Sequence, residues 1–208
     1  RALLCGIGGL GIIVMAIIML PFLRVGGMQL FQMESSDKSE KVLPRAFELT
    51  MATAAVFMGL VLTCAFLYTW FGMEDFDAIC HAFSSVATGD FSNYDASFAH
   101  YTEPAIHWTG TAFMALGAMP FVVFIKAVRG KPGAIWQDVQ VRGFVGVLVA
   151  VSLIMAVWLV FTRNITFFDA ITLSSFNVTS IVTTTGYMSE DYTKCGRFAI
   201  GVFFLLAC

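Results

Sequence analysis

Charged residues are scarce in this sequence of 208 residues: only 12% are Asp, Glu, Lys or Arg, against about 25% in an ordinary soluble domain. Hydrophobic residues make up 58% of the chain, and its mean hydropathy is +0.81. This balance excludes a soluble globular enzyme and a disordered chain. A basic excess is also missing, because 12 Lys and Arg stand against 14 Asp and Glu, which argues against nucleic acid as a partner. The composition predicts a membrane protein.

Several signals of covalent or metal chemistry are missing as well. The five cysteines form no CxxC pair and no metal-ligand spacing, so we interpret them as small apolar packing residues. No HExxH or GxSxG spacing occurs, and neither catalysis nor a cofactor is expected. A start Met and a signal peptide are absent, and the last uncharged run, from Phe198, is shorter than the roughly 20 residues that a bilayer requires. The sequence is therefore expected to be an internal piece of a longer protein.

Uncharged runs long enough to cross a bilayer recur along the chain, since each reaches the roughly 20 residues that a spanning helix needs. They lie at 2–23, 49–73, 104–125 and 143–162, and the unfinished run at the end would be a fifth. Pro120 predicts a kink in the third run.

The charges between these runs predict an orientation. Lys and Arg gather in the linkers after the first and third runs, whereas residues 72–103 contain neither and carry several acidic side chains. By the positive-inside rule the two basic linkers are cytoplasmic and the acidic stretch faces outward. The second basic linker, 126–142, is either this orientation signal alone or also a docking face for a regulatory subunit.

A repeated motif occurs in two segments that we expect on the outer side, the acidic stretch 72–103 and the linker that follows residue 162. Phe76-Asp-Ala-Ile79 recurs as Phe168-Asp-Ala-Ile171, 92 residues later. Each copy opens an apolar stretch too short or too polar to span, and each stretch runs into threonine and glycine, at 87–89 and at 183–186. The predicted unit is a spanning helix, a half-helix, a Thr-Gly loop and a second spanning helix. The predicted fold class is an all-α membrane protein of repeated helix–pore loop–helix units.

The two Thr-Gly loops predict cation binding. Irregular backbone at membrane depth is tolerated where it lines a water-filled cavity, and glycine lets successive carbonyl groups turn the same way. Threonine adds a hydroxyl oxygen, and rings of such oxygens replace the hydration shell of an alkali cation. The alternative is that these small and hydroxylated residues only let helices pack closely, but their repetition after the same opening argues against it.

Acidic side chains near the loops have more than one interpretation. Asp77 and Asp169 are expected to cap the first turn of each half-helix rather than to contact an ion directly. Beyond the loops, carboxylates would form an outer mouth that concentrates cations, or would only solvate an outer loop. These candidates for the outer mouth are Asp90, Asp95, Glu190 and Asp191.

The histidines give the hypothesis of a different class. His81, His100 and His107 show no i, i+4 pairing, so we expect them to pack through hydrogen bonds rather than to bind a metal or relay protons. The alternative is a multi-span membrane enzyme that uses His81 or His107 with an acidic partner.

Four motifs occur in order along the chain: Gly6-Ile-Gly-Gly-Leu-Gly11, Arg24-Val-Gly-Gly-Met-Gln-Leu-Phe31, Val86-Ala-Thr-Gly89 and Val182-Thr-Thr-Thr-Gly-Tyr187. Together they resemble the Trk/Ktr superfamily of potassium transporters, most closely the bacterial Trk membrane (pore) subunit. The resemblance covers essentially the whole chain. It implies potassium uptake, by channel or symport, across the bacterial inner membrane through one pore of four repeats. It also implies a homodimer and cytosolic nucleotide-binding regulatory subunits.

The resemblance implies a map of the chain. Residues 1–33 would hold the second spanning helix of repeat one, 34–45 a cytoplasmic loop, 46–129 repeat two, 130–142 a second cytoplasmic loop, and 143–208 repeat three with its last helix truncated. The implied potassium ligands of the selectivity filter are Ala87, Thr88, Gly89, Thr184, Thr185 and Gly186.

One residue departs from the family pattern, and one part of the pore is missing. Family members often carry a second small residue where this chain has Asp90. Its carboxylate would either approach the outer ion site or point into solvent. Because the first filter lies outside the sequence, a sodium-permeable member of the same superfamily is the alternative within transport.

Overall fold

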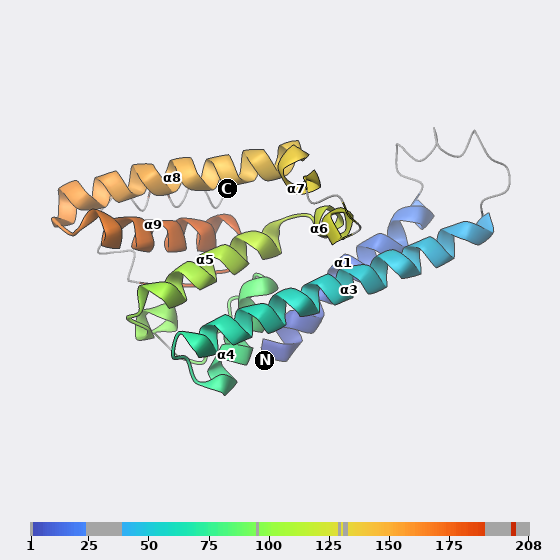
Figure 1. Cartoon of the computed structure of the whole chain (residues 1–208), viewed down its shortest axis with the longest axis horizontal. Coiled ribbons are helices and arrows are strands. Elements are labelled where there is room, and N and C mark those ends of the chain that lie inside the picture. Colours follow the sequence, from blue (N-terminus) through green and yellow to red (C-terminus); the bar gives the residue numbers. More distant parts are fainter. Residues whose placement is uncertain are drawn as a thin grey trace.

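The computed structural model describes residues 2–23, 39–94, 96–128, 130, 133–189 and 201–202. The described part is a set of helices joined by turns and short loops, with the half-helices lying beside the long helices (Figure 1). The elements are α1 (Ala2–Leu23), α3 (Ser39–Trp70), α4 (Asp75–Val86), the 3₁₀ turn η1 (Ser97–His100), α5 (Pro104–Ala118), α6 (Phe121–Val128), α7 (Ala134–Gln137), α8 (Val139–Arg163) and α9 (Phe167–Val182).

Two helices are long and apolar enough to cross a membrane, judged by length and composition: Thr50–Trp70 within α3, and α8. Helix α3 begins at Ser39, well before the uncharged run that starts at residue 49. The reason is that charged side chains are excluded from the hydrocarbon core but not from a helix that continues into water. An uncharged run therefore marks the membrane-embedded part of a helix and not its end.

The third predicted span is broken at its proline. Helix α5 ends at Ala118, and α6 begins directly after Pro120 with a different direction, so that it is seen nearly end-on in Figure 1. Met119 has an extended backbone (φ −77°, ψ 151°), as expected for a residue that precedes proline. The predicted kink is confirmed, and it is a complete interruption of the helix.

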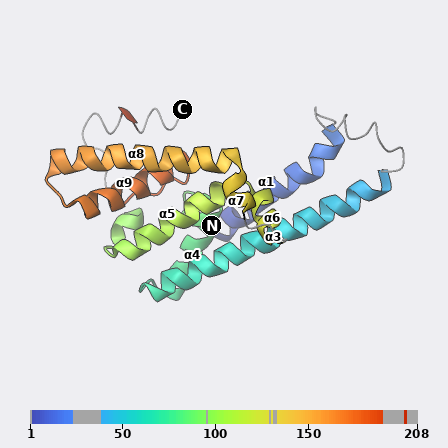
Figure 2. The same cartoon turned by 45° about the horizontal axis from the view of Figure 1, so that its top comes forward.

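Helices α4 and α9 are the predicted half-helices. They contain 12 and 16 residues, about 18 and 24 Å at 1.5 Å per residue, which is less than the roughly 30 Å of a hydrocarbon core. Helix α9 lies alongside α8 in both views (Figures 1 and 2), and α4 packs against α3 and α1. The repeated unit of long helix and returning half-helix is thus present twice.

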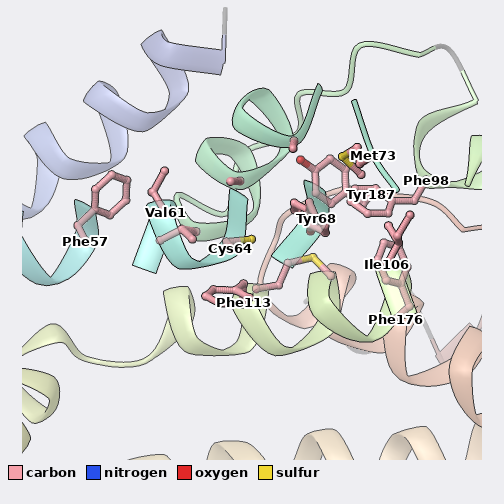
Figure 3. Close-up of a cluster of buried hydrophobic side chains, with 14 of the residues drawn as sticks. Phe57, Val61, Cys64, Tyr68, Met73, Phe98, Ile106, Phe113, Phe176 and Tyr187 are labelled. Atoms are coloured by element: carbon pink, nitrogen blue, oxygen red, sulfur yellow. The ribbon is translucent and has the colours of Figure 1, made fainter. Parts of the chain in front are cut away.

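One of the two hydrophobic clusters among the described residues joins the two units, and the other lies between α8 and α9. Figure 3 shows Tyr68 of α3 and Phe98 of η1 meeting Phe176 of α9 and Tyr187, which follows α9. Each of these four side chains is fully buried. The ring of Phe98 lies 4.9 Å from that of Phe176 and 4.5 Å from that of Tyr187. The loops that follow α4 and α9 are therefore held in a single packed frame.

Candidate functional site

The loops after the two half-helices have the same backbone fold. In each loop, the second residue after the helix donates its backbone N–H to the carbonyl of the residue three positions earlier in the sequence. The next residue donates its N–H to the carbonyl of a serine five positions earlier. The bonds are Thr88 N–H to Ser85 O (3.4 Å) and Gly89 N–H to Ser84 O (2.8 Å) in one loop, and Thr184 N–H to Ile181 O (3.0 Å) and Thr185 N–H to Ser180 O (2.8 Å) in the other.

One threonine in each loop has left-handed backbone geometry. Thr88 has φ 51° and Thr184 has φ 57°, a region that β-branched residues seldom occupy. Such strain costs on the order of 1–3 kcal/mol and persists where the surroundings over-determine it, often at functional sites. The sequence marked both threonines as filter residues, and the structure gives them the same unusual conformation.

This correspondence changes how the two loops align. The opening Phe-Asp-Ala-Ile motifs are 92 residues apart, but the loop hydrogen bonds are 96 residues apart, because α9 has 16 residues and α4 has 12. Thr88 therefore matches Thr184, and Gly89 matches Thr185. The sequence paired the two glycines, whereas the structure pairs Gly186 with Asp90.

Carbonyl oxygens in these loops lack donors. Within the described residues, no hydrogen-bond donor engages the backbone oxygens of Ala87, Thr88, Thr184 or Gly186. Thr184 and Gly186 are exposed and Ala87 and Thr88 are half-buried, so these oxygens are accessible from outside the protein. Rings of such oxygens can replace the hydration shell of a cation. Both loops can thus offer oxygen ligands. The side-chain hydroxyl of Thr185 is not available in the same way, because it is buried and forms a hydrogen bond of 2.7 Å with the Thr183 hydroxyl.

Buried serines brace the loops from the half-helices. Ser180 Oγ donates to the carbonyl of Tyr187 (2.8 Å), and the Ser84 hydroxyl bonds the carbonyl of Gly89 and accepts from the N–H of Phe91. Both serines are fully buried. The sequence analysis missed these serines because it treated the hydroxyl residues of each half-helix only as a sign that the helix is too polar to span the membrane. The available signal was their spacing, since Ser84 precedes Thr88, and Ser180 precedes Thr184, by four residues.

Further hydrogen bonds tie the loop of repeat three to the outer loop of repeat two. Tyr187 Oη donates to the carbonyl of Phe91 (3.1 Å), Ala99 N–H donates to the carbonyl of Met188 (3.1 Å), and Met188 N–H donates to Ser97 Oγ (3.3 Å). These contacts join residues more than 85 positions apart in the sequence. The structure therefore brings the two predicted filter loops together.

Glycines allow helices to approach the loop of repeat two. A Cβ on Gly9 of α1 would lie 3.3 Å from the Cβ of Ala87, and a Cβ on Gly117 of α5 would lie 2.3 Å from the carbonyl oxygen of Val86. A Cβ on Gly6 of α1 would likewise lie 2.6 Å from the Phe83 ring, whereas one on Gly11 would have no neighbour within 4 Å. A cavity of about 260 Å³ lies beside this loop, lined in part by Gly9, Thr88 and Gly117.

The expected caps of the half-helices differ from each other. Asp169 does take part in a cap: Thr166 accepts from its N–H (3.3 Å), and its carboxylate accepts from the Thr166 hydroxyl (2.5 Å). Asp77 does not cap α4, so this expectation is wrong. Its carboxylate accepts from Asn93 Nδ2 (2.6 Å), Tyr94 Oη (2.6 Å) and Tyr101 Oη (3.4 Å). Asp77 therefore fastens the outer loop to the half-helix.

These hydrogen bonds set the protonation of the Asp77 cluster. Burial raises the pKa of Asp77, but the hydrogen bonds from Tyr94 and Asn93 outweigh it and leave the pKa below its ordinary value. The same hydrogen bond raises the pKa of Tyr94. A carboxylate whose pKa is lowered on folding stabilises the fold above its unfolded pKa, and the stabilisation is lost as the pH falls through the folded pKa.

Asp77→Asn is therefore expected to destabilise the full-length protein at neutral pH by about 1.5–3 kcal/mol, the usual contribution of a hydrogen bond to a charged group. The difference should begin to shrink below about pH 4, where Asp77 of the unfolded wild type takes up a proton, and should vanish only below the lower pKa of the folded state. Thermal unfolding of both proteins over a pH series measures this. Asp75→Asn, on an exposed side chain of the same turn, is the matched control. An equal loss in the control would contradict the role of Asp77.

The histidines are held by hydrogen bonds. His81 lies 2.8 Å from the carbonyl of Asp77 through Nδ1 and 3.1 Å from Ser92 Oγ through Nε2, so Nδ1 donates and Nε2 accepts. His107 donates from Nε2 to the carbonyl of Tyr101 (2.8 Å), and His100 stacks on Tyr94 with centroids 3.9 Å apart. No group of three His, Cys, Asp or Glu that could hold a metal ion exists among the described residues.

The candidates for the outer mouth divide into two sets. Asp90 is exposed, and its carboxylate lies against Gly186, since a Cβ built on that glycine would be 2.6 Å from both Cγ and Oδ1 of Asp90. Asp95, Glu190 and Asp191 lie outside the described residues. The Asp90 side chain is thus both exposed and adjacent to the backbone of the neighbouring loop.

Comparison with known proteins decides the family. The family model TrkH, described as a cation transport protein, matches residues 1–208, which is the whole chain. The chain belongs to the TrkH family. The family is described as a family of cation transport proteins and not of enzymes. The all-helical fold with repeated pore-helix units, expected from the sequence, is confirmed.

Relatives of the TrkH family share the whole length of this chain. The Trk system potassium uptake protein TrkI of Halomonas elongata is 46% identical over 207 residues, covering 99% of this chain and 42% of that protein. TrkH of Escherichia coli is 33% identical, covering 95% and 42%. The crystal structure of the potassium transporter TrkH from Vibrio parahaemolyticus superposes with a TM-score of 0.85 at 30% identity, covering 99% and 42%. The chain thus spans less than half of the length of these relatives.

Proposed function

We propose that this chain forms the central part of a potassium uptake protein, in which the loops at 87–89 and 184–186 contribute to the selectivity filter. The observation that carries this proposal is the pair of matched loops, with left-handed threonines and carbonyl oxygens that have no donor among the described residues. Relatives named as Trk system potassium uptake proteins support potassium as the transported ion. Potassium is then the substrate, and no cofactor is needed.

The ends of the half-helices support the choice of a cation. Both α4 and α9 end at these loops, so the C-terminal ends of their dipoles, with partial negative charge, point to the proposed ion path. Neither helix has a basic residue in its last turn. An anion at this place would be repelled by the carbonyl oxygens and the Asp90 carboxylate.

The wider organisation follows from the same proposal. Residues 1–33 belong to repeat one, 46–129 to repeat two and 143–208 to repeat three. The cytoplasmic segments are 34–45, which includes the start of α3, and 130–142, which includes α7 and the start of α8. The protein crosses the bacterial inner membrane several times. The "Trk system" in the names of its relatives supports partner subunits, which we propose to be a second copy of the chain and a cytosolic nucleotide-binding regulatory subunit.

The test uses the full-length protein in a bacterial strain that lacks potassium uptake. Wild type is expected to restore growth at low potassium and to take up rubidium. Gly186→Asp, which places a second carboxylate against Asp90, should abolish both while the protein still reaches the membrane. Competition of rubidium uptake by potassium and sodium separates the two ions.

Each result has a definite meaning. Uptake that sodium blocks better than potassium would replace potassium by sodium as the substrate. Uptake that survives Gly186→Asp would remove the loop at 184–186 from the filter. Absence of uptake by well-expressed wild type, with the regulatory subunit of a relative supplied, would overturn the proposed transport activity.

A further inference from the structure

The position of Asp90 in the first loop carries an inference beyond the proposed potassium pathway. By the hydrogen-bond register described above, Asp90 occupies the place that Gly186 holds in the second loop. Gly186 has φ +79°, but Asp90 is not among the described residues with a positive φ. The first loop therefore brings a charged side chain to a place where the second loop has only backbone.

The Asp90 carboxylate is directed from its own loop toward the other. The contact of Cγ and Oδ1 with the added Cβ of Gly186, both at 2.6 Å, means that the carboxylate fills the side-chain space that Gly186 leaves empty. A carboxylate that served only an outer rim would have no reason to lie against the backbone of the second filter loop.

No protein group neutralises this charge in the described part of the chain. Asp90 is exposed and has no hydrogen bond and no ion pair there, and several carbonyl oxygens of the two loops also lack donors among the described residues. A carboxylate and carbonyl oxygens each attract a positive charge. A cation that enters between the loops would therefore be attracted by both kinds of oxygen.

We infer that the Asp90 carboxylate is a direct ligand of the permeating alkali cation. It takes the place of the backbone-only ligand that Gly186 provides in the second loop, and the inference rests on the proposed transport function. A carboxylate is a ligand of higher field strength than a carbonyl dipole, and field strength is one determinant of cation selectivity. Hard divalent cations also prefer carboxylate oxygens, so external calcium should compete with the transported ion at this site.

The experiment compares rubidium uptake by full-length wild type, Asp90→Asn and Asp90→Gly at low and high concentrations of impermeant N-methylglucamine chloride. Loss of the carboxylate is expected to raise the half-saturating rubidium concentration about tenfold, equivalent to about 1.4 kcal/mol, and to weaken inhibition by calcium. Asp90→Gly restores the residue type of the second loop and keeps the test valid if the asparagine variant folds poorly. Glu103→Gln, an exposed acidic residue on the same expected side, is the matched control and should behave like wild type.

Ionic strength separates a ligand from a distant attractive charge. The Debye length falls from about 10 Å at 0.1 M salt to about 3 Å at 1 M, so an effect of long-range attraction would vanish in high salt, whereas the loss of a ligand would persist. A difference that vanishes in high salt, or no difference between the variants and wild type, would overturn the inference.

A second readout keeps the inference testable without transport. Thermal unfolding of the purified full-length protein is followed during titration with potassium chloride against N-methylglucamine chloride at constant ionic strength. Stabilisation of wild type that the Asp90 variants lose would support the ligand role even if uptake is absent and the proposed function fails. Equal stabilisation of all proteins, or none, would overturn it.

Discussion

Gly117→Ala is expected to displace the end of α4 and to destabilise the protein by about 1–3 kcal/mol, the usual cost of inserting a methyl group into a packed site. The new Cβ would lie 2.3 Å from the carbonyl oxygen of Val86 and 3.0 Å from its carbonyl carbon. Both atoms belong to the backbone, so no side-chain rotation relieves the contact. Val86 directly precedes the loop at 87–89, and the displacement should therefore also reduce rubidium uptake.

Thermal unfolding and uptake of the full-length variant measure this effect. Gly146→Ala is the matched control, because it lies in the middle of α8 and its added Cβ has no atom of the described residues within 4 Å. Alanine is the better helix former by up to about 1 kcal/mol, so the control should be neutral or more stable. A Gly117→Ala protein with the stability and uptake of wild type would show that α5 does not press on the loop of repeat two.

Gly186→Ala is expected to damage the second loop for two reasons that can be measured separately. The position has φ +79°, which costs an alanine roughly 1–2 kcal/mol, and the added Cβ would also collide with the Asp90 carboxylate at 2.6 Å. Gly72→Ala has the first cost only, since Gly72 has φ +96° with no atom within 4 Å of the added Cβ. The Gly186 variant should therefore lose more stability than the Gly72 variant.

The double variant Gly186→Ala, Asp90→Gly isolates the collision. Removing the carboxylate should recover the excess loss, so that the two changes are not additive, as expected for residues in contact. Thermal unfolding is the appropriate readout, because Asp90 is also proposed to bind the transported ion. Strict additivity of the two changes would mean that the Asp90 side chain does not lie against Gly186.

Much of the fold could be predicted because the membrane imposes a strong rule. Scarcity of charge marked the apolar helices, and Pro120 marked the break between α5 and α6. Helix ends that lie outside the apolar runs were harder to predict. Helix α3 starts at Ser39 and α8 at Val139, each among polar residues that a helix accepts in water. The shared motif located both half-helices, since each begins one residue before its Phe-Asp-Ala-Ile.

The geometry of the site was harder to predict. Type and order of residues indicated the loops, but pairing Gly89 with Gly186 differs by one residue from the register that the loop hydrogen bonds give, in which Gly89 matches Thr185. The role of Asp77 was missed because its partners Asn93 and Tyr94 follow an irregular loop. No periodic pattern in a sequence indicates where such a loop will return.

The unequal half-helices show how far the repeats can diverge. Four additional residues lengthen α9 by about 6 Å and advance its helical phase by a little more than one full turn, so nearly the same face of the helix still meets its neighbours. An insertion of two residues would instead place the buried face on the opposite side. Because the loop geometry is the same after both helices, the additional turn lies at the end of α9 away from its loop. The length of the supporting helix and the geometry of the loop are therefore independent of each other in this chain.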